Sequence, residues 1–165
     1  MAEALLARQL AQAGVDARVH SAGLLYDGES PPVDGIEVMA TRGIDTSGHV
    51  SRKMTQEMLQ DADLVIGMAK EHVREAVLLV PETWPKAFTI KELVRRGEEA
   101  GPRRPGQTLL DWTSSVHAGR TRAEMLGASA EDDVADPIGR RRSYYDDTAA
   151  ELDDLTARLA KLIAG

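Results

Sequence analysis

The sequence contains no cysteine. This absence excludes disulfides, thiolate metal sites and a cysteine nucleophile among the printed residues. Long apolar runs are missing too: none approaches the ~20 residues that cross a membrane, so we expect no membrane partner. The start, Met1-Ala-Glu-Ala-Leu-Leu6, has no basic stretch before an apolar block, which predicts no signal peptide and a cytoplasmic protein.

Positive charge is in the minority. Twenty lysines and arginines face 27 aspartates and glutamates, which gives a formal net charge of −7. This balance disfavours nucleic acid as the main partner. His20, His72 and His117 stand far apart, without the spacing of metal ligands. We therefore expect neither a metal site nor another cofactor.

What is present is an ordinary globular composition. The chain has 165 residues, of which 42% are hydrophobic and 28% charged. These values predict a single domain over residues 1–165. A chain of this length buries ~70% of its unfolded surface, so it needs no covalent cross-link.

Apolar periodicity predicts helices that alternate with short strands. The predicted helices are 1–13, 31–41, 56–60, 70–79, 89–96, 109–116 and a C-terminal helix with Leu152, Leu155, Leu159 and Leu162 on one face. A capping box, Thr89-Ile-Lys-Glu92, opens the helix that Gly97 is expected to end. The predicted strands are 17–20, a buried strand at 63–68, and one ending at 87–88. The alternation predicts an α/β fold with a mostly parallel sheet, whose site lies at the carboxyl ends of the strands.

Three polar segments are candidates for chemistry, and each also has a purely structural interpretation. The loop 43–52 concentrates Asp, Ser, His and Arg, as surface loops bonded to themselves also do. Asp136 precedes a proline, so it is held extended, either as a general acid or as a turn residue. The run Arg140-Arg-Arg142 is typical of a solvated helix start, and it could also hold an anionic substrate.

Five pieces of the chain, in this order, resemble the low-molecular-weight protein tyrosine phosphatase family, which also includes one class of arsenate reductases. The pieces are Met1-Ala-Glu-Ala-Leu-Leu6, Ser21-Ala-Gly23, Gly43-Ile-Asp-Thr-Ser-Gly-His-Val-Ser-Arg52, Ala62-Asp-Leu-Val-Ile-Gly-Met68 and Asp136-Pro-Ile-Gly139. The resemblance implies a three-layer fold, phosphotyrosine-phosphatase-I-like, with a mostly parallel sheet flanked by helices. The segment 87–93 and a lengthened region, inserted at 97–131, resemble an actinobacterial branch.

One part of the family pattern is not in the printed sequence. Members begin with a strand that runs into a phosphate loop, Cys-x-x-x-x-x-Arg-Ser-Pro, and their first helix then starts with Met-Ala-Glu. The printed chain starts at that Met. The resemblance therefore implies that the central strand, which lies between 17–20 and 63–68, the nucleophilic Cys and the phosphate-binding Arg are missing. We expect the printed chain to be inactive and its fold to be weakened.

The resemblance also assigns roles to five residues. Asp136 matches the general acid that protonates the leaving oxygen. Ser21 and His49 match the residues that brace the phosphate loop. Tyr26 falls near the aromatic wall of the substrate site, and Ile138 stands where many members have an aromatic residue. The implied partners are a phosphotyrosine protein or a small aryl phosphate.

Three hypotheses follow. In the first, the chain is a phosphatase sequence that starts at an internal Met, and the intact protein hydrolyses phosphomonoesters through a cysteinyl-phosphate. In the second, it is a noncatalytic binding module that retains the fold. The third, arsenate reduction, needs several thiols in relay and is disfavoured because the printed chain has none.

Overall fold

The chain forms two compact units in the computed structural model, which describes residues 1–127 and 129–165. The first unit comprises Met1–Lys53 and Ala135–Ala160, and the second Met54–Val134 and Lys161–Gly165. Among the described residues, no helix combines the length and apolar character needed to cross a membrane. A single domain over 1–165, with an insertion at 97–131, stays a prediction.

The first unit is built from helices and long connecting segments. Its helices are α1 (Ala2–Gln12), α2 (Val33–Ala40) and α7 (Arg142–Ala164), which belongs to this unit as far as Ala160. Val38 of α2 packs with Tyr145 and Ala149 of α7. The guanidinium of Arg8 on α1 forms a 2.8 Å ion pair with Asp153 of α7. The predictions of helices at 1–13 and 31–41 and at the C-terminus are confirmed.

The predicted strand at 17–20 is wrong. Residues 15–20 have no regular secondary structure, and among the described residues the backbone groups of 16–20 make no hydrogen bond. A strand exists only through its ladder with a neighbour, and no residue that the structure describes pairs with this segment. The first unit has one isolated parallel bridge nearby, between Gly23 and Lys53.

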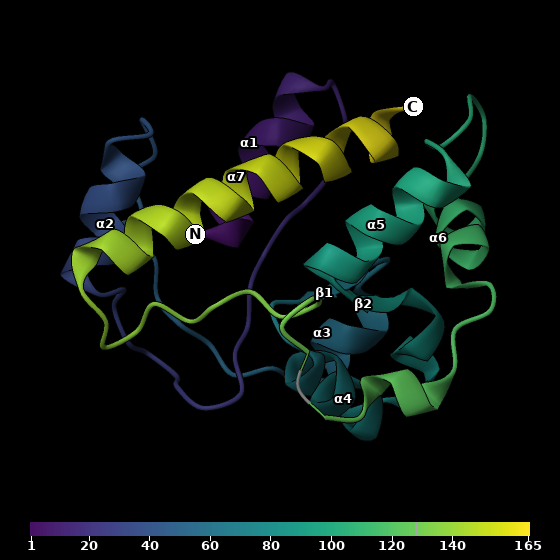
Figure 1. Cartoon of the computed structure of the whole chain (residues 1–165), viewed down its shortest axis with the longest axis horizontal. Coiled ribbons are helices and arrows are strands. Elements are labelled where there is room, and N and C mark those ends of the chain that lie inside the picture. Colours follow the sequence, from purple (N-terminus) through teal and green to yellow (C-terminus); the bar gives the residue numbers. More distant parts are fainter. Residues whose placement is uncertain (128) are drawn as a thin grey trace. The chain divides into compact units, whose positions relative to one another are not determined.

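The second unit contains a small parallel sheet. Its elements are α3 (Gln56–Asp61), β1 (Val65–Gly67), α4 (Lys70–Leu79), the 3-10 helix η1 (Pro81–Lys86), β2 (Ala87–Thr89), α5 (Ile90–Ala100), α6 (Leu109–His117) and the 3-10 helix η2 (Arg122–Met125). β1 and β2 pair in parallel, with Ile66 opposite Phe88. Figure 1 shows α5 on one side of the strands and α3 and α4 on the other. This layered α/β arrangement confirms the predicted fold class.

The two strands differ in burial. All three residues of β2 are buried, whereas Val65 and Ile66 of β1 are half-buried. β1 has a strand partner on one side only, since the sheet has two strands in the order β1-β2. The prediction of a strand within 63–68 is therefore confirmed, but of its three residues only Gly67 is buried as predicted.

Helix α5 shows how the sequence sets the helix boundaries. Thr89 is the N-cap, and its side chain accepts a 3.1 Å hydrogen bond from the Glu92 backbone N–H, as the capping signal predicts. The expected end at Gly97 is wrong, because α5 continues to Ala100. Gly97 is buried where a Cβ would lie 2.9 Å from Leu162 and 3.1 Å from the indole of Trp112. This glycine is thus used for close packing, not as a stop signal.

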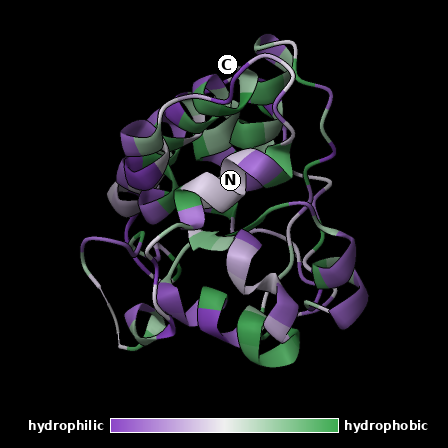
Figure 2. Cartoon of the chain, turned by 90° about the vertical axis from the view of Figure 1, so that its right-hand side faces the viewer, coloured by the Kyte–Doolittle hydropathy of each residue, from purple (hydrophilic) through white to green (hydrophobic). Residues whose placement is uncertain are grey.

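The helices are two-sided. In Figure 2 hydrophobic and hydrophilic residues alternate around the same helices. On α5 the buried side consists of Ile90, Leu93, Val94 and Gly97, which recur at the spacing of a helical face. Phe88 of β2 and Trp112 of α6 are among the largest fully buried side chains of the second unit. Burial of these faces holds the carboxyl ends of β1 and β2 in place.

Candidate functional site

Two residues that the sequence singles out, Ser21 and His49, meet at Glu3. The Ser21 hydroxyl donates a hydrogen bond to the Glu3 carboxylate. The ring Nδ1 of His49 lies 3.8 Å from the same carboxylate. Glu3 stands in the first turn of α1, where the helix dipole favours a negative charge. The start of α1 therefore gathers polar groups from segments far apart in the sequence.

Arg52 and the backbone around Gly23 tie these segments together. The Arg52 Nε donates a 3.0 Å hydrogen bond to the Ser21 carbonyl. The N–H of Gly23 in turn donates a 2.9 Å bond to the Arg52 carbonyl. Further along, the Ser51 N–H donates a 2.9 Å hydrogen bond to the Glu29 carbonyl, and the Glu29 N–H donates a 3.0 Å bond to the Ser51 hydroxyl oxygen. Ser21 and His49 thus sit on segments with defined mutual positions, as bracing residues must.

Asp136 lies on an exposed turn. Its carboxylate accepts a 3.0 Å hydrogen bond from the N–H of Ile138, and Pro137 beside it is buried. The preceding carbonyl, of Ala135, accepts a 3.3 Å bond from the Thr148 hydroxyl of α7. The turn is therefore anchored to α7, while the Asp136 side chain faces solvent. Among the described residues, no hydrogen bond or ion pair joins Asp136 to Ser21 or His49.

The two expected wall residues are largely exposed. Tyr26 is 61% exposed, and so is Ile138. Single exposed apolar side chains are common on protein surfaces. The roles of Asp136, Ser21, His49, Tyr26 and Ile138 therefore stay predictions.

Glu3 is the polar residue of this cluster that the sequence reasoning missed. It lies within the first of the five family-like pieces, but nothing local marks it as a partner for Ser21 or His49. Its position in the first turn of a helix without a side-chain cap is the one usable signal. Had the uncapped start of this helix been matched with the hydroxyl of Ser21 and the imidazole of His49, Glu3 would have been identified as their shared partner.

The second unit contains a separate polar cavity of about 210 Å³. Its lining residues are Lys70, Val73, Trp84, Thr89, Glu92, Arg95, Arg96, Arg120, Glu124, Met125 and Asp132. The carboxyl end of β2 contributes Thr89, which matches the edge where ligands bind in parallel sheets. No group of three or more His, Cys, Asp or Glu suited to a metal occurs in the described ranges 1–127 and 129–165.

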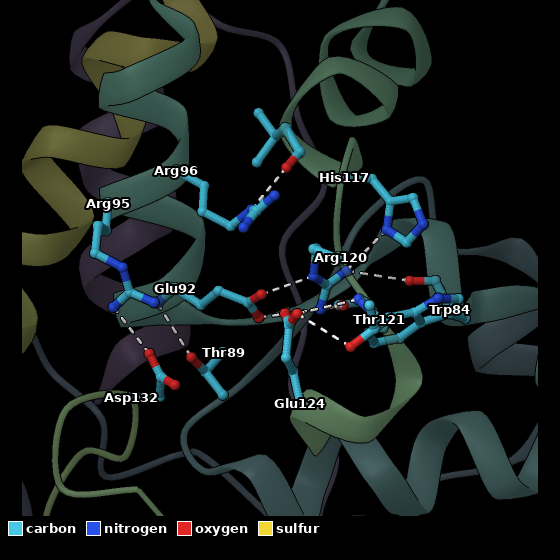
Figure 3. A network of polar contacts seen from close by, with 12 residues as sticks. Trp84, Thr89, Glu92, Arg95, Arg96, His117, Arg120, Thr121, Glu124 and Asp132 are labelled. Atoms are coloured by element: carbon cyan, nitrogen blue, oxygen red, sulfur yellow. Dashed lines mark hydrogen bonds and ion pairs between the residues drawn. The ribbon is translucent and has the colours of Figure 1, made fainter. Parts of the chain in front are cut away.

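Arg120 is the centre of this network (Figure 3). Its side chain is 1% exposed and makes two hydrogen bonds to Glu92, of 2.7 and 3.0 Å. The guanidinium carbon lies 4.0 Å from the ring centroids of both Trp84 and Phe88. Such a sandwich combines an ion pair with two cation–π contacts. Burial lowers the pKa of Arg120, and the charge of Glu92 opposes that shift.

Two other groups of the network have shifted pKa values. Burial lowers the pKa of His117, and the charges of Arg120 and Arg96 lower it further. Burial alone would raise the pKa of Asp132. The hydrogen bonds from Arg95 and Lys70, together with their charges, outweigh burial and hold that pKa below its usual value. The nearest contacts are 2.9 Å from Arg95 and 3.1 Å from Lys70.

The charges of this cavity are matched internally. Arg120 pairs with Glu92, and Lys70 and Arg95 share Asp132. Arg96 donates to two carbonyls at the end of α6, at 2.8 and 2.6 Å. Since these partners already bind the cations, we interpret the cavity as a structural network.

Comparisons with known proteins identify the family of this α/β protein. The family model described as low molecular weight phosphotyrosine protein phosphatase matches residues 1–102. The chain belongs to this family. The actinobacterial branch stays a prediction.

Three relatives illustrate the likeness. The chain is 31% identical over 75 residues to low molecular weight protein-tyrosine-phosphatase Etp of Escherichia coli K12, which covers 46% of this chain and 51% of Etp. The chain thus spans about half the length of that relative. It is 27% identical over 163 residues to the protein-arginine-phosphatase of Bacillus subtilis, across 98% of this chain and 85% of the relative. The crystal structure of a low molecular weight protein tyrosine phosphatase from T. tengcongensis superposes with a TM-score of 0.70 at 31% identity, covering 96% and 86% of the two chains.

Proposed function

We propose that the chain forms the general-acid and loop-bracing part of a protein phosphatase, and that the printed residues do not turn over substrate by themselves. The convergence of Ser21 and His49 on Glu3 carries the proposal. By the family resemblance, the phosphate loop directly precedes the start of α1. Ser21 and His49, the residues expected to brace that loop, both contact Glu3 at the start of α1. A surface loop of arbitrary sequence would not be expected to make these contacts.

The chemistry proposed for the intact enzyme has two steps. A cysteine thiolate attacks phosphorus as the bond to the leaving oxygen breaks, and Asp136 transfers its proton to that oxygen. Water then hydrolyses the cysteinyl-phosphate, releasing phosphate and regenerating the thiolate, with Asp136 now accepting the proton from water. The printed residues contain no cysteine, so neither step can start from them.

Observations in each unit support a missing neighbouring strand. The backbone groups of 16–20 make no hydrogen bond within the described residues, and the Nδ1 of His20, at the end of this segment, is buried there without a hydrogen-bond partner. In the other unit, β1 is half-buried although its partner β2 is fully buried. Unpaired backbone groups and a half-buried strand are both expected where a neighbouring strand is missing. We therefore propose that the intact protein supplies a strand and phosphate loop from sequence outside the printed residues.

Phosphotyrosine on proteins is the substrate we propose first, because the matching family is described by that activity. Phosphoarginine is the second candidate. The observation that favours it is the match to the protein-arginine-phosphatase over 98% of this chain, together with an aliphatic Ile138 where many members have an aromatic side chain. A noncatalytic binding module is the remaining alternative.

The test uses the reading frame extended upstream, compared with the printed chain. We expect the extended protein to hydrolyse p-nitrophenyl phosphate if an in-frame Cys-x-x-x-x-x-Arg-Ser-Pro precedes Met1. Hydrolysis of phosphotyrosine and phosphoarginine peptides by the same preparation then distinguishes the two substrate classes. Stop codons directly upstream, or binding of phosphopeptides without turnover, would support the binding module instead.

The role of Asp136 is tested in the extended protein. Asp136→Asn should slow release of a poor leaving group by roughly 10²–10⁴-fold and affect a good leaving group much less. Asp147→Asn, an exposed aspartate of α7 in the same unit, is the matched control and should leave both rates unchanged. Equal losses on good and poor leaving groups would make Asp136 a structural turn residue.

A further inference from the structure

Three consecutive arginines follow the Asp136 turn, at the start of α7. Arg142 is already occupied, because its guanidinium forms an ion pair with Glu37 of α2. The Arg140 guanidinium lies 5.8 Å from the ring centroid of Tyr144, a loose cation–π contact that leaves its hydrogen-bond donors available. The Arg141 side chain is exposed and makes no hydrogen bond or ion pair with any residue that the structure describes.

The segment that carries these arginines is fixed at both ends. The Arg140 N–H donates a 2.9 Å hydrogen bond to the Pro137 carbonyl, and Gly139 has a φ of +73°, which allows the tight turn. At the far end, the Tyr144 N–H donates a 2.9 Å bond to the Arg141 carbonyl as α7 begins. Arg140 and Arg141 are therefore held at a defined distance from Asp136.

That distance can be bounded from chain geometry. Five residues span at most about 18 Å when fully extended, and the turn shortens the path from Asp136 to Arg141. An extended peptide advances about 3.3 Å per residue. If the phosphorylated residue of a bound peptide lies at Asp136, the peptide residues up to about five positions away from it can therefore reach the guanidinium groups of Arg140 and Arg141.

We propose that Arg140 and Arg141 bind acidic residues that flank the phosphorylated residue of a protein substrate. The inference rests on the proposed function. It is favoured by charge: the chain carries a net charge of −7, so an acidic substrate is repelled by the molecule as a whole. Two unpaired cations beside the general acid offset this repulsion locally and orient the substrate segment.

The turnover experiment uses the extended, active protein. It compares two phosphotyrosine peptides with Asp and Glu, or with Lys, at positions two to five from the phosphotyrosine. Exposed ion pairs are weak, so we expect Arg140→Gln/Arg141→Gln to lower kcat/KM for the acidic peptide by about threefold to tenfold, mainly through KM. The Lys peptide and p-nitrophenyl phosphate should be unaffected. Arg122→Gln, an exposed arginine of η2 in the second unit, is the control.

The binding experiment uses the printed chain as it is. Titration of the acidic peptide should shift the backbone amide signals of residues 138–144, and the double variant should weaken this binding by about threefold or more. Equal kcat/KM of the variant and the parent on the acidic peptide, or unchanged amide shifts, would overturn the inference. Binding of phosphatidylserine vesicles through the same arginines, without preference for acidic peptides, would also overturn it. Failure of every substrate to turn over would instead refute the proposed function, and the amide shifts would still decide the inference.

Discussion

Replacing the buried Arg120 by methionine should destabilise the second unit strongly. Methionine preserves much of the packing between the Trp84 and Phe88 rings but removes the charge. The Glu92 carboxylate, 13% exposed, then loses both hydrogen bonds from its ion-pair partner. The Ala87 carbonyl loses a 2.8 Å bond at a fully buried position. Leaving a buried charge unpaired costs about 3–5 kcal/mol in the free energy of unfolding.

A double-mutant cycle tests whether the loss comes from the ion pair. Arg120→Met combined with Glu92→Leu removes both charges, so the double variant should recover most of the stability that Arg120→Met loses. Arg74→Ala removes the partly exposed 3.8 Å pair with Glu75 in the same unit and should change the free energy of unfolding by less than about 0.5 kcal/mol.

Urea denaturation followed by tryptophan fluorescence reports on this unit selectively. The chain has two tryptophans, Trp84 and Trp112, and both belong to the second unit. A loss below about 1 kcal/mol for Arg120→Met would refute the reasoning, since it would mean that Glu92 finds water or another cation at no cost. A double variant as unstable as the single one would show that the loss comes from packing.

Two further outcomes are expected in the same unit. The pKa of His117 is lowered by burial and by Arg120, so protonation of this side chain disfavours the folded state. The contribution to the free energy of unfolding should be complete above about pH 6.5 and should be lost as the pH falls toward the folded pKa. His117→Gln should flatten this dependence in urea midpoints measured from pH 8 to 5. A midpoint that rises on acidification would contradict it. Gly97→Ala should lower the free energy of unfolding by about 1–3 kcal/mol, because the new Cβ meets Leu162 and Trp112 and overpacking outweighs the gain in helix propensity. A stabilised variant would show that these neighbours yield.

Most helices could be predicted from the sequence because local signals define them. The Thr89 cap of α5 is an example: a hydroxyl three residues before an available N–H is a local event. The same segment also shows which features cannot be predicted from local sequence. The Glu92 side chain is used by Arg120, which lies far along the chain, and Gly97 is set by contacts with Leu162 and Trp112. Such long-range packing has no local signature.

The prediction of a strand at 17–20 was wrong for a related reason. Its composition suits a strand, but a strand depends on a partner for its backbone hydrogen bonds, and none of the described residues provides one. In the candidate site, the pattern selected Ser21 and His49 but not Glu3, which they share. A motif identifies residue types at a given spacing, whereas the fold decides which other side chain forms hydrogen bonds or ion pairs with them.

Hydrolysis of p-nitrophenyl phosphate by the printed chain and by its upstream-extended form, measured side by side, tests the central claim most directly. The account predicts no turnover by the printed 165 residues, which contain no cysteine, and turnover by the extended form that is lost when its loop cysteine is changed to serine. Turnover by the printed chain that survives purification and is abolished by Asp136→Asn would contradict the account, because the chemistry would then lie entirely within these residues.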